Sequence, residues 1–363
     1  MFNHRFPASR LAAYASLLSA WVTFTSSARA DEVAPPPSAS APAPVEAAAA
    51  PVEAAPPPAE AVPPPAVAAA EPAPLEAPPP AAAKPKPPPY SLPWQLRPVA
   101  PSNVVRLDTT FGFYESPSTG NSGSAQVTSL LGSYKVIPNL AVSARVGFVH
   151  NSPPDAAPKS ATSILNPVIG GLYGFKLGKD FKLGLFLGVT VPIGSGGGTN
   201  PNTDKAAANG VGALTRSAMD NAMFAVDYLT IFPGIDFAFV RGGFTAQVEA
   251  TIFQLTKVRG PDSLDDSRTN FTTGLHVGYF VLPVLSLGGE IRHQRWLSTP
   301  TMVKNDPTDT LRDTTTFAVG PRFHFKFSET VWFRPGIALA LPIDDPMKKN
   351  DYKIAQLDLP LSF

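Results

Sequence analysis

The chain has 363 residues, a formal net charge of +1 and no cysteine. A charge so close to neutral excludes the basic stripe that nucleic-acid binding requires, and the lack of cysteine excludes disulfides, thiolate metal sites and a cysteine nucleophile. Charged residues make up only 16% of the chain, against about 25% in typical soluble domains.

The first thirty residues have the three-part layout of a secretory signal peptide. Arg5 and Arg10 stand in a leading part without acidic residues, an apolar run (LAAYASLLSAWVTF) follows, and SSARA places small residues at Ala28 and Ala30. The apolar run has about 14 residues, fewer than the roughly 20 of a spanning helix, so a retained membrane anchor is the less favoured alternative. We therefore expect residues 1–30 to be removed before Asp31.

Residues 31–98 are predicted to form a disordered, Pro/Ala-rich periplasmic tether. The stretch from 31 to about 89 is nearly all alanine and proline, with single glutamates at intervals. It lacks the large apolar side chains that offset the entropy of ordering, and proline favours extended polyproline II. The alternative to a plain tether is that residues 31–90 bind peptidoglycan or a periplasmic protein.

From about residue 99 onward apolar residues alternate with small or polar ones, which is the period of a β-strand. In FKLGLFLGVTVPI every second residue from Phe181 to Ile193 is apolar. The pair Pro233-Gly234 predicts a bend or a bulge in the sixth stretch. Twelve stretches show the alternation, near 103–114, 125–136, 140–150, 164–176, 181–193, 223–239, 243–257, 270–281, 284–297, 314–326, 330–341 and 352–363.

The connections between these stretches are short and long in turn, which favours an up-and-down sheet with its tight turns at one end. The stretches also reach the roughly 9–11 residues that a membrane strand needs, whereas globular strands average about five or six. Closure of the sheet leaves no unpaired edge, which lipid would not tolerate. The predicted fold class is therefore all-β, an antiparallel up-and-down transmembrane β-barrel of about 12 strands over residues 99–363, whose last strand pairs with the first.

The last strand carries a regular apolar row that ends on an aromatic residue. This row consists of Leu357, Leu359, Leu361 and Phe363. Together with the signal peptide and the alternating strands, it resembles the ending of Gram-negative outer-membrane β-barrels; no single family is specified. The resemblance implies that the row is the signal read by the barrel-assembly machinery. It also implies contact with outer-membrane lipid, a periplasmic tether and extracellular long loops.

Aromatic residues near the strand ends are expected to form two interfacial girdles. The inner girdle would comprise Tyr134, Tyr173, Phe181, Tyr279 and Phe363, and the outer one Phe113, Trp296 and Tyr352. Pro360, unusual in such a strand, has the parity of the face turned away from lipid.

The face opposite the apolar rows carries charges that would be costly in hydrocarbon, so we expect it to line the lumen. Strand parity assigns to the lumen Arg106, Asp108, Arg145, Glu249, His276, Glu290, Arg292, Arg322, Lys326, Arg334 and Asp358. These are six fixed cations and four anions, which predicts a weak anion preference in an open pore. Salt bridges that merely fill the barrel are the alternative, since twelve strands lie between the filled eight-stranded and the open sixteen-stranded barrels.

The longest loop, residues 194–221, is expected to fold inward and narrow the lumen. The stretch ALTRSAMDN at its end is the candidate for a short helix. GSGGGTN is glycine-rich but no Lys-Ser/Thr follows it, which favours a mobile loop over a phosphate cradle.

The best catalytic candidate is His150 with Ser152, at the outer end of the third stretch. Outer-membrane phospholipases keep a His-x-Ser site on such a face, although Pro153-Pro154 stands here in place of the usual Asn-Gly. Asn166 is a conceivable third, orienting group. No histidines form H-E-x-x-H, and we expect neither a metal nor another cofactor.

These features predict an outer-membrane channel, and not an enzyme, that passes small polar or amphipathic solutes by diffusion. A closed structural or adhesive barrel whose surface loops bind a partner is the alternative, and an outer-membrane hydrolase is third. An autotransporter is disfavoured because the segment before the barrel is too simple to be a passenger.

Overall fold

The computed structural model describes residues 90–363, so the predicted signal peptide and the tether up to residue 89 lie outside the described residues. One antiparallel sheet closes on itself, because the first strand, β1 (Val104–Glu115), pairs with the last, β15 (Lys353–Ser362). The backbone N–H of Phe363 also donates to the carbonyl of Asn103 at 3.2 Å. The predicted pairing of the last strand with the first is confirmed.

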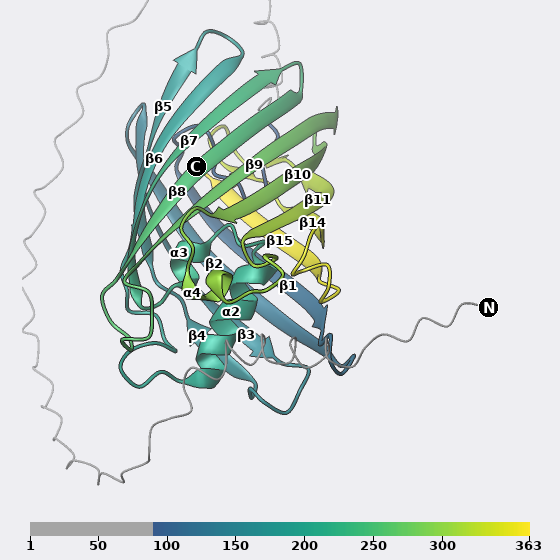
Figure 1. The fold of residues 1–363 in the computed structure, drawn as a ribbon. Coiled ribbons are helices and arrows are strands. Elements are labelled where there is room, and N and C mark those ends of the chain that lie inside the picture. Colours follow the sequence, from purple (N-terminus) through teal and green to yellow (C-terminus); the bar gives the residue numbers. More distant parts are fainter. Residues whose placement is uncertain (1–89) are drawn as a thin grey trace, which may run out of the picture. The chain divides into compact units, whose positions relative to one another are not determined.

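The remaining strands follow one another around the barrel in chain order (Figure 1). They are β2 (Ser122–Ile137), β3 (Leu140–Ser152), β4 (Ala161–Ile164), β5 (Val168–Leu177), β6 (Phe181–Thr190), β7 (Tyr228–Arg241), β8 (Phe244–Lys257), β9 (Ser267–Leu282), β10 (Leu285–Trp296), β11 (Asp313–Phe323), β12 (Phe325–Lys326), β13 (Trp332–Phe333) and β14 (Gly336–Pro342). Since β4, β12 and β13 are short extensions beside β5, β11 and β14, the barrel has twelve strands. The predicted all-β fold with about 12 strands is confirmed.

Strand β7 continues through Pro233-Gly234 with an unchanged register. Ile231 lies opposite Gln254 and Gly234 opposite Thr251, so the offset to β8 is the same on both sides. The proline has no N–H to give to the ladder, and the pairing is interrupted only locally. A bulge at this position, one of the two predicted alternatives, is excluded.

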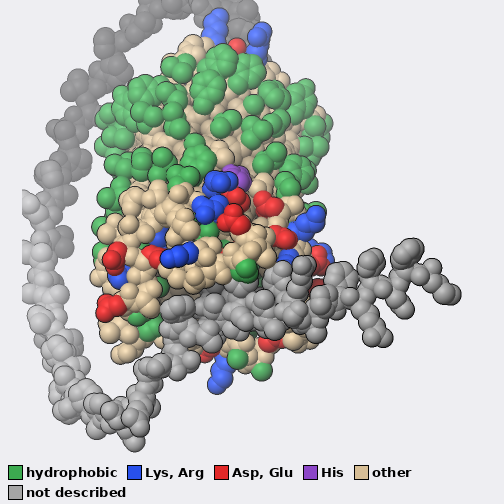
Figure 2. All heavy atoms as spheres, viewed as in Figure 1, with side chains coloured by type: hydrophobic (Ala, Val, Ile, Leu, Met, Phe, Trp, Pro, Cys, Tyr) green, Lys and Arg blue, Asp and Glu red, His purple; other side chains and the backbone are tan. Residues whose placement is uncertain are grey.

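The outer face of the barrel is apolar and exposed. Figure 2 shows hydrophobic side chains over much of the strand surface and charged side chains gathered toward the end where the helices lie. On β15, Leu357 and Leu361 are exposed, and so is Phe363 just beyond the strand end, whereas Pro360 is buried on the opposite side as expected. An apolar belt around a polar interior is the arrangement of a β-barrel in a membrane.

Two of the aromatic residues predicted for the outer girdle are buried instead. Trp296 has the same parity as the buried Arg292 of β10, and it packs in a core cluster that includes Phe224. Tyr352 stacks on Tyr114, with ring centroids 5.2 Å apart. Strand parity at the very end of a strand, rather than closeness to the rim, decides which way such a ring points. The other predicted girdle residues are exposed, namely Phe113, Tyr134, Tyr173, Phe181, Tyr279 and Phe363.

Three helices come from the long loops: α2 (Thr203–Thr215), α3 (Asn221–Phe224) and α4 (Thr301–Lys304). Helix α2 begins after Asn202, whose side chain accepts a hydrogen bond from the N–H of Lys205 at 2.9 Å. None of the described helices is long and apolar enough to cross a membrane.

Helix α2 packs against β1 to β4, so the loop between β6 and β7 folds inward as predicted. The predicted position of its helix, ALTRSAMDN, is wrong, because the capped helix lies earlier and residues 216–220 form turns. The backbone is left-handed at Ser217 (φ 55°) and Ala218 (φ 53°), a conformation that cannot continue a right-handed helix.

Candidate functional site in the filled lumen

Residues 90–102, which we call the lumenal segment, lie inside the barrel. Trp94 and Leu96, at its middle, are almost completely buried. Its two arms are neighbours, since the N–H of Val99 donates to the Tyr90 hydroxyl at 3.4 Å. The chain therefore turns back on itself in the lumen before it enters β1 from the end with the short turns.

This segment shifts the boundary between tether and barrel. The predicted boundary at residue 99 is wrong for residues 90–98, which are packed against the strands. The physical reason is a change of composition, because SLPWQL supplies the large apolar side chains that the Pro/Ala stretch lacks.

Side chains of the barrel wall bind the backbone of the lumenal segment. The Glu290 carboxylate accepts hydrogen bonds from the N–H groups of Trp94 and Gln95, the second at 3.2 Å. The Arg322 guanidinium donates to the carbonyl of Pro93 at 3.1 Å. Such charge-assisted bonds satisfy a backbone that has no strand partner of its own.

Glycines make room in the wall for the lumenal segment. A Cβ atom placed on Gly274 would lie 2.8 Å from Leu96, and one on Gly278 would lie 2.3 Å from the Ser91 hydroxyl, both too close for real contacts. The lumenal face of the strands therefore carries small residues because a peptide segment lies against it. The glycines whose added Cβ would meet this segment are Gly174, Gly184, Gly234, Gly274, Gly278, Gly288 and Gly336.

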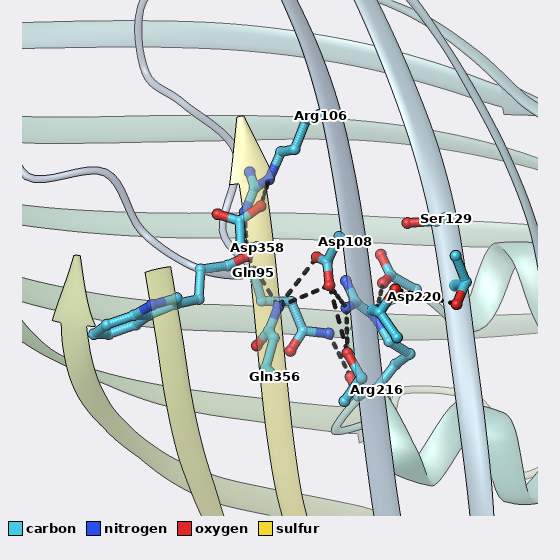
Figure 3. Close-up of polar contacts among 12 residues, drawn as sticks. Gln95, Arg106, Asp108, Ser129, Arg216, Asp220, Gln356 and Asp358 are labelled. Atoms are coloured by element: carbon cyan, nitrogen blue, oxygen red, sulfur yellow. Dashed lines mark hydrogen bonds and ion pairs between the residues drawn. The ribbon is translucent and has the colours of Figure 1, made fainter. Parts of the chain in front are cut away.

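Asp358 stands at the centre of the first charge cluster. Its two carboxylate oxygens pair with Arg106 and Arg322, each at 2.6 Å, and all three side chains are buried or nearly so. Figure 3 shows Arg106 and Asp358 pointing toward one another from β1 and β15. The expected contact between strands one and twelve is thus present, and these arginines are paired rather than free.

The second cluster joins the inward loop to the wall (Figure 3). Arg216, just after α2, bridges Asp108 of β1 and Asp220, with both distances 2.8 Å. Arg145 of β3 binds the same Asp220 through both of its terminal nitrogens, at 2.8 and 3.1 Å. Burial alone would raise the pKa of Asp220, but Arg145 and Arg216 outweigh it and lower that pKa.

The third cluster contains Asp236 and Glu249, which face Arg97 of the lumenal segment. Arg97 Nε lies 3.4 Å from Asp236 Oδ2, and Arg97 Nη1 lies 3.2 Å from Glu249 Oε1. Its Nη2 donates to the hydroxyl of Thr251 at 2.8 Å. Among the lumenal charges described here, this cluster alone takes its cation from the lumenal segment rather than from the wall or the α2 loop.

The remaining residues assigned to the lumen by strand parity are placed as follows. Glu290 pairs with Arg292 at 3.0 Å, and the buried His276 meets the Trp94 ring edge-on at 5.7 Å between centroids. At the short-turn end the Lys326 ammonium pairs with Glu329 at 2.8 Å, away from the middle of the lumen. Arg334 lies over the Trp332 ring, 5.5 Å from its centroid.

The space left beside the lumenal segment is small. One cavity of about 120 Å³ extends from Ser102 and Ser133 to Met223, and Arg97, Arg145, Asp220 and Glu249 are among the side chains that line it. It has room for a few water molecules or one small solute.

The His150 and Ser152 pair lies on the outer face, as predicted. Ser152 Oγ is 3.4 Å from His150 Nε2, and His150 Nδ1 lies 2.9 Å from the Thr162 hydroxyl. The suggestion that Asn166 orients the histidine is wrong, because its amide bonds the carbonyl of Ala225 and the N–H of Gly194. Within residues 90–363 no three His, Cys, Asp or Glu side chains are placed to hold a metal ion.

Sequence reasoning missed four lumenal residues. Arg97 lay in the part assigned to the tether, Asp236 in the irregular β7, and Arg216 and Asp220 in a loop to which strand parity does not apply. Two signals were available. Asp236 has the same parity as the inward Tyr228 and Phe232, and the composition changes at residue 90.

A closed twelve-stranded sheet, an apolar outer belt and a charged interior define an outer-membrane-type β-barrel. The sequence matches no protein-family model and no curated protein.

Solved structures with a similar fold include outer-membrane channels and a translocator. The COG4313 outer membrane channel from Pseudomonas putida F1 is 14% identical, with a TM-score of 0.47 over 74% of this chain and 98% of that chain. The KdgM porin is 10% identical, with a TM-score of 0.41 over 71% and 99% of the two chains. The translocator domain of the autotransporter NalP from Neisseria meningitidis is 10% identical, with a TM-score of 0.42 over 74% and 90%. At these values the likeness assigns neither a solute nor an activity.

Proposed function

We propose that the protein is an outer-membrane channel that passes small polar or amphipathic solutes by diffusion, and that the lumenal segment narrows it in the state described. One observation carries this proposal. The wall offers glycines where the segment lies, so at these positions the lumen is occupied by a peptide outside the strands and not by wall side chains. Withdrawal of the segment would leave a passage.

The lumenal segment can leave without damage to the barrel. It precedes β1, and residues 90–102 contribute no strand to the closed sheet. Each hydrogen bond that holds it contributes on the order of 1 kcal/mol net, or about 1.5–3 kcal/mol where a charged group takes part. These bonds can be exchanged for bonds to water, whereas an open strand edge in lipid cannot be satisfied in this way.

Conductance across a planar lipid bilayer tests the proposal. The mature chain is compared with a variant that lacks residues 90–100, and a deletion of equal length within residues 50–80 is the matched control. We expect a several-fold larger single-channel conductance when the lumenal segment is removed, and no change in the control. If none of the three proteins conducts ions across the bilayer, the proposed channel function is wrong.

The second candidate is a closed structural or adhesive barrel whose loops bind a partner. The buried pairing of Asp358 with Arg106 and Arg322 favours it, because such pairs fill space and stiffen a wall. Binding of peptidoglycan or a periplasmic protein by residues 31–90 would suit either function. An outer-membrane hydrolase at His150 and Ser152 is third, since Thr162, a neutral hydroxyl, stands where a carboxylate or amide would orient the histidine.

A further inference from the structure

We propose that Asp236, Glu249, Thr251 and the ring of Phe186 form a binding site for small organic cations that carry a guanidinium group, and that Arg97 occupies this site in the state described. The inference rests on the proposed channel, because a solute must enter the lumen to reach the site. It names the class of solute that the lumen selects.

The two carboxylates are an unfavourable pair without a cation. Asp236 and Glu249 lie directly opposite one another on the neighbouring strands β7 and β8, and both side chains are buried. Like charges in that position repel, and buried carboxylates need a partner of opposite charge. Within residues 90–363, both ion pairs that these two carboxylates form go to Arg97, which does not belong to the wall. The wall by itself is therefore a site that lacks its cation.

The surroundings suit a flat guanidinium rather than any cation. The ring of Phe186 lies 4.5 Å from Arg97 Cζ, and the Thr251 hydroxyl accepts a hydrogen bond from Nη2. A Cβ atom on Gly234 would lie 2.4 Å from Nη2, so the absence of a side chain there is required for the group to fit. An aromatic face and several acceptors in different directions match the planar fork of a guanidinium.

One oxygen of the site is still free. Asp236 Oδ1 is buried and has no hydrogen-bond partner among the described residues, and the whole side chain is inaccessible to solvent. Arg97 reaches Asp236 only through Nε, at 3.4 Å, because its side chain is tied to the lumenal segment. A free guanidinium can approach Asp236 with two parallel N–H groups and satisfy both oxygens, which is the preferred geometry of such pairs.

The site opens onto the lumen. Arg97 and Glu249 border the cavity of about 120 Å³, together with Phe186. A solute that replaces Arg97 thus needs no new opening in the wall, only a shift of the lumenal segment.

This placement offsets the weak anion preference expected from the strand charges. That count omitted Asp236, and it applied to an open pore in which the arginines were not paired with carboxylates. Arg145 shares Asp220 with Arg216, and Arg106 shares Asp358 with Arg322. When the lumenal segment leaves and takes Arg97 with it, Asp236 and Glu249 are the pair left without a cation, and fixed charges of this sign favour cations in a narrow pore.

Chemical rescue of an emptied site is the test. The mature protein with Arg97→Ala is refolded in detergent, and its melting temperature is followed as methylguanidinium is added at millimolar concentration. We expect a rise of several degrees, because a ligand that binds the folded state stabilises it, and little change with tetramethylammonium at equal ionic strength. Arg145→Ala is the matched control, since it also removes a lumenal guanidinium but leaves Asp220 paired with Arg216.

A second variant ties the effect to the carboxylates. Adding Asp236→Asn to Arg97→Ala should abolish the rescue. If Arg97→Ala does not fold, Arg97→Lys keeps a cation for the pair, and methylguanidinium should still stabilise it more than tetramethylammonium does. The same response in Arg145→Ala, or none in either Arg97 variant, overturns the site.

Bilayer recordings separate the site from the channel. In Arg97→Ala, methylguanidinium should reduce the potassium current, and the reduction should vanish when Asp236→Asn is added. Rescue of stability without any conductance would leave the site in place and refute the channel. Conductance without a preference for methylguanidinium would support the channel and refute the site.

Discussion

Two segments fill the lumen of this barrel, and they are fastened in different ways. The lumenal segment comes before β1 and is held mainly through its backbone, by wall side chains such as Glu290 and Arg322. The α2 loop joins β6 to β7 and is held by side-chain ion pairs at Asp220 and by an apolar cluster that includes Phe224 and Val149.

The difference separates a part that can move from a part that is permanent. The α2 loop is anchored in the sheet at both ends, so its exit would strain two strands. The lumenal segment is anchored in the sheet only where it meets β1, and the glycines facing it have no side chains that could fill its place. We therefore expect changes at the first segment to alter the pore, and changes at the α2 loop to alter stability alone.

The largest expected effect is that of Asp358→Ala. It leaves two buried guanidiniums, Arg106 and Arg322, without their carboxylate, and removal of one partner from a buried cluster costs about 3–5 kcal/mol. Because Arg322 also holds Pro93, the lumenal segment should be released as well. Urea unfolding in lipid vesicles reports the lost stability, and chymotrypsin cleavage at Trp94 reports the release.

Asp220→Ala is the matched variant, since it too removes a carboxylate shared by two guanidiniums but belongs to the α2 loop; Arg145 loses its carboxylate, and Arg216 keeps Asp108. It should lower the unfolding free energy while Trp94 stays protected from chymotrypsin. Equal cleavage in both variants would mean that the two segments do not behave independently.

Gly274→Leu should displace the lumenal segment by overpacking. Its side chain would enter the space of Leu96, and overpacking a tight contact costs about 1–3 kcal/mol. Cleavage at Trp94 should increase while the barrel keeps its heat-modifiable mobility on gels. Gly132→Leu is the control, because an added Cβ there meets nothing within 4 Å. If Trp94 stays protected from chymotrypsin in Gly274→Leu, the glycines do not determine where the lumenal segment binds.

Phe363→Ala tests whether the barrel wall can be impaired in its assembly while the lumenal segment stays in place. The aromatic end of β15 is exposed on the apolar row, and burial of such a ring in lipid contributes roughly 1.5–3 kcal/mol. We expect a lower fraction of heat-modifiable, folded barrel in the membrane and unchanged secretion. In the barrel that does form, Trp94 should be protected as in the native protein. A normal folded fraction would remove the terminal row as the assembly signal.

The wall was predictable from the sequence, and its contents were predictable only in part. The alternation in the twelve stretches arises because one side of each strand faces lipid and the other faces a polar space. This requirement acts on each residue separately, so it can be recognised from the local sequence. The inward charges followed from the same parity, as did the approach of Asp358 to Arg106.

The partners of those charges depend on chain segments that have no strand period. Arg97 and Arg216 reach the wall from the lumenal segment and from the α2 loop, at positions fixed only by the closed barrel. Strand parity predicts which side of the wall a charged side chain faces. Its ion-pair partner depends on the lumenal segment and the α2 loop, whose positions strand parity does not predict.

The smallest predicted effect is that of Asn202→Ala at the start of α2. The Asn202 side chain caps the helix by accepting the N–H of Lys205, and loss of such a cap costs about 1 kcal/mol. The cost should fall on the α2 loop only, because Asn202 touches neither the wall clusters nor the lumenal segment in the described hydrogen bonds. Hydrogen exchange should accelerate in residues 203–215 and stay unchanged in residues 90–102, and pore conductance should not differ from that of the native protein. Faster exchange in both segments would show that the α2 loop and the lumenal segment open together, and the division between a movable and a permanent part of the lumen would then fail.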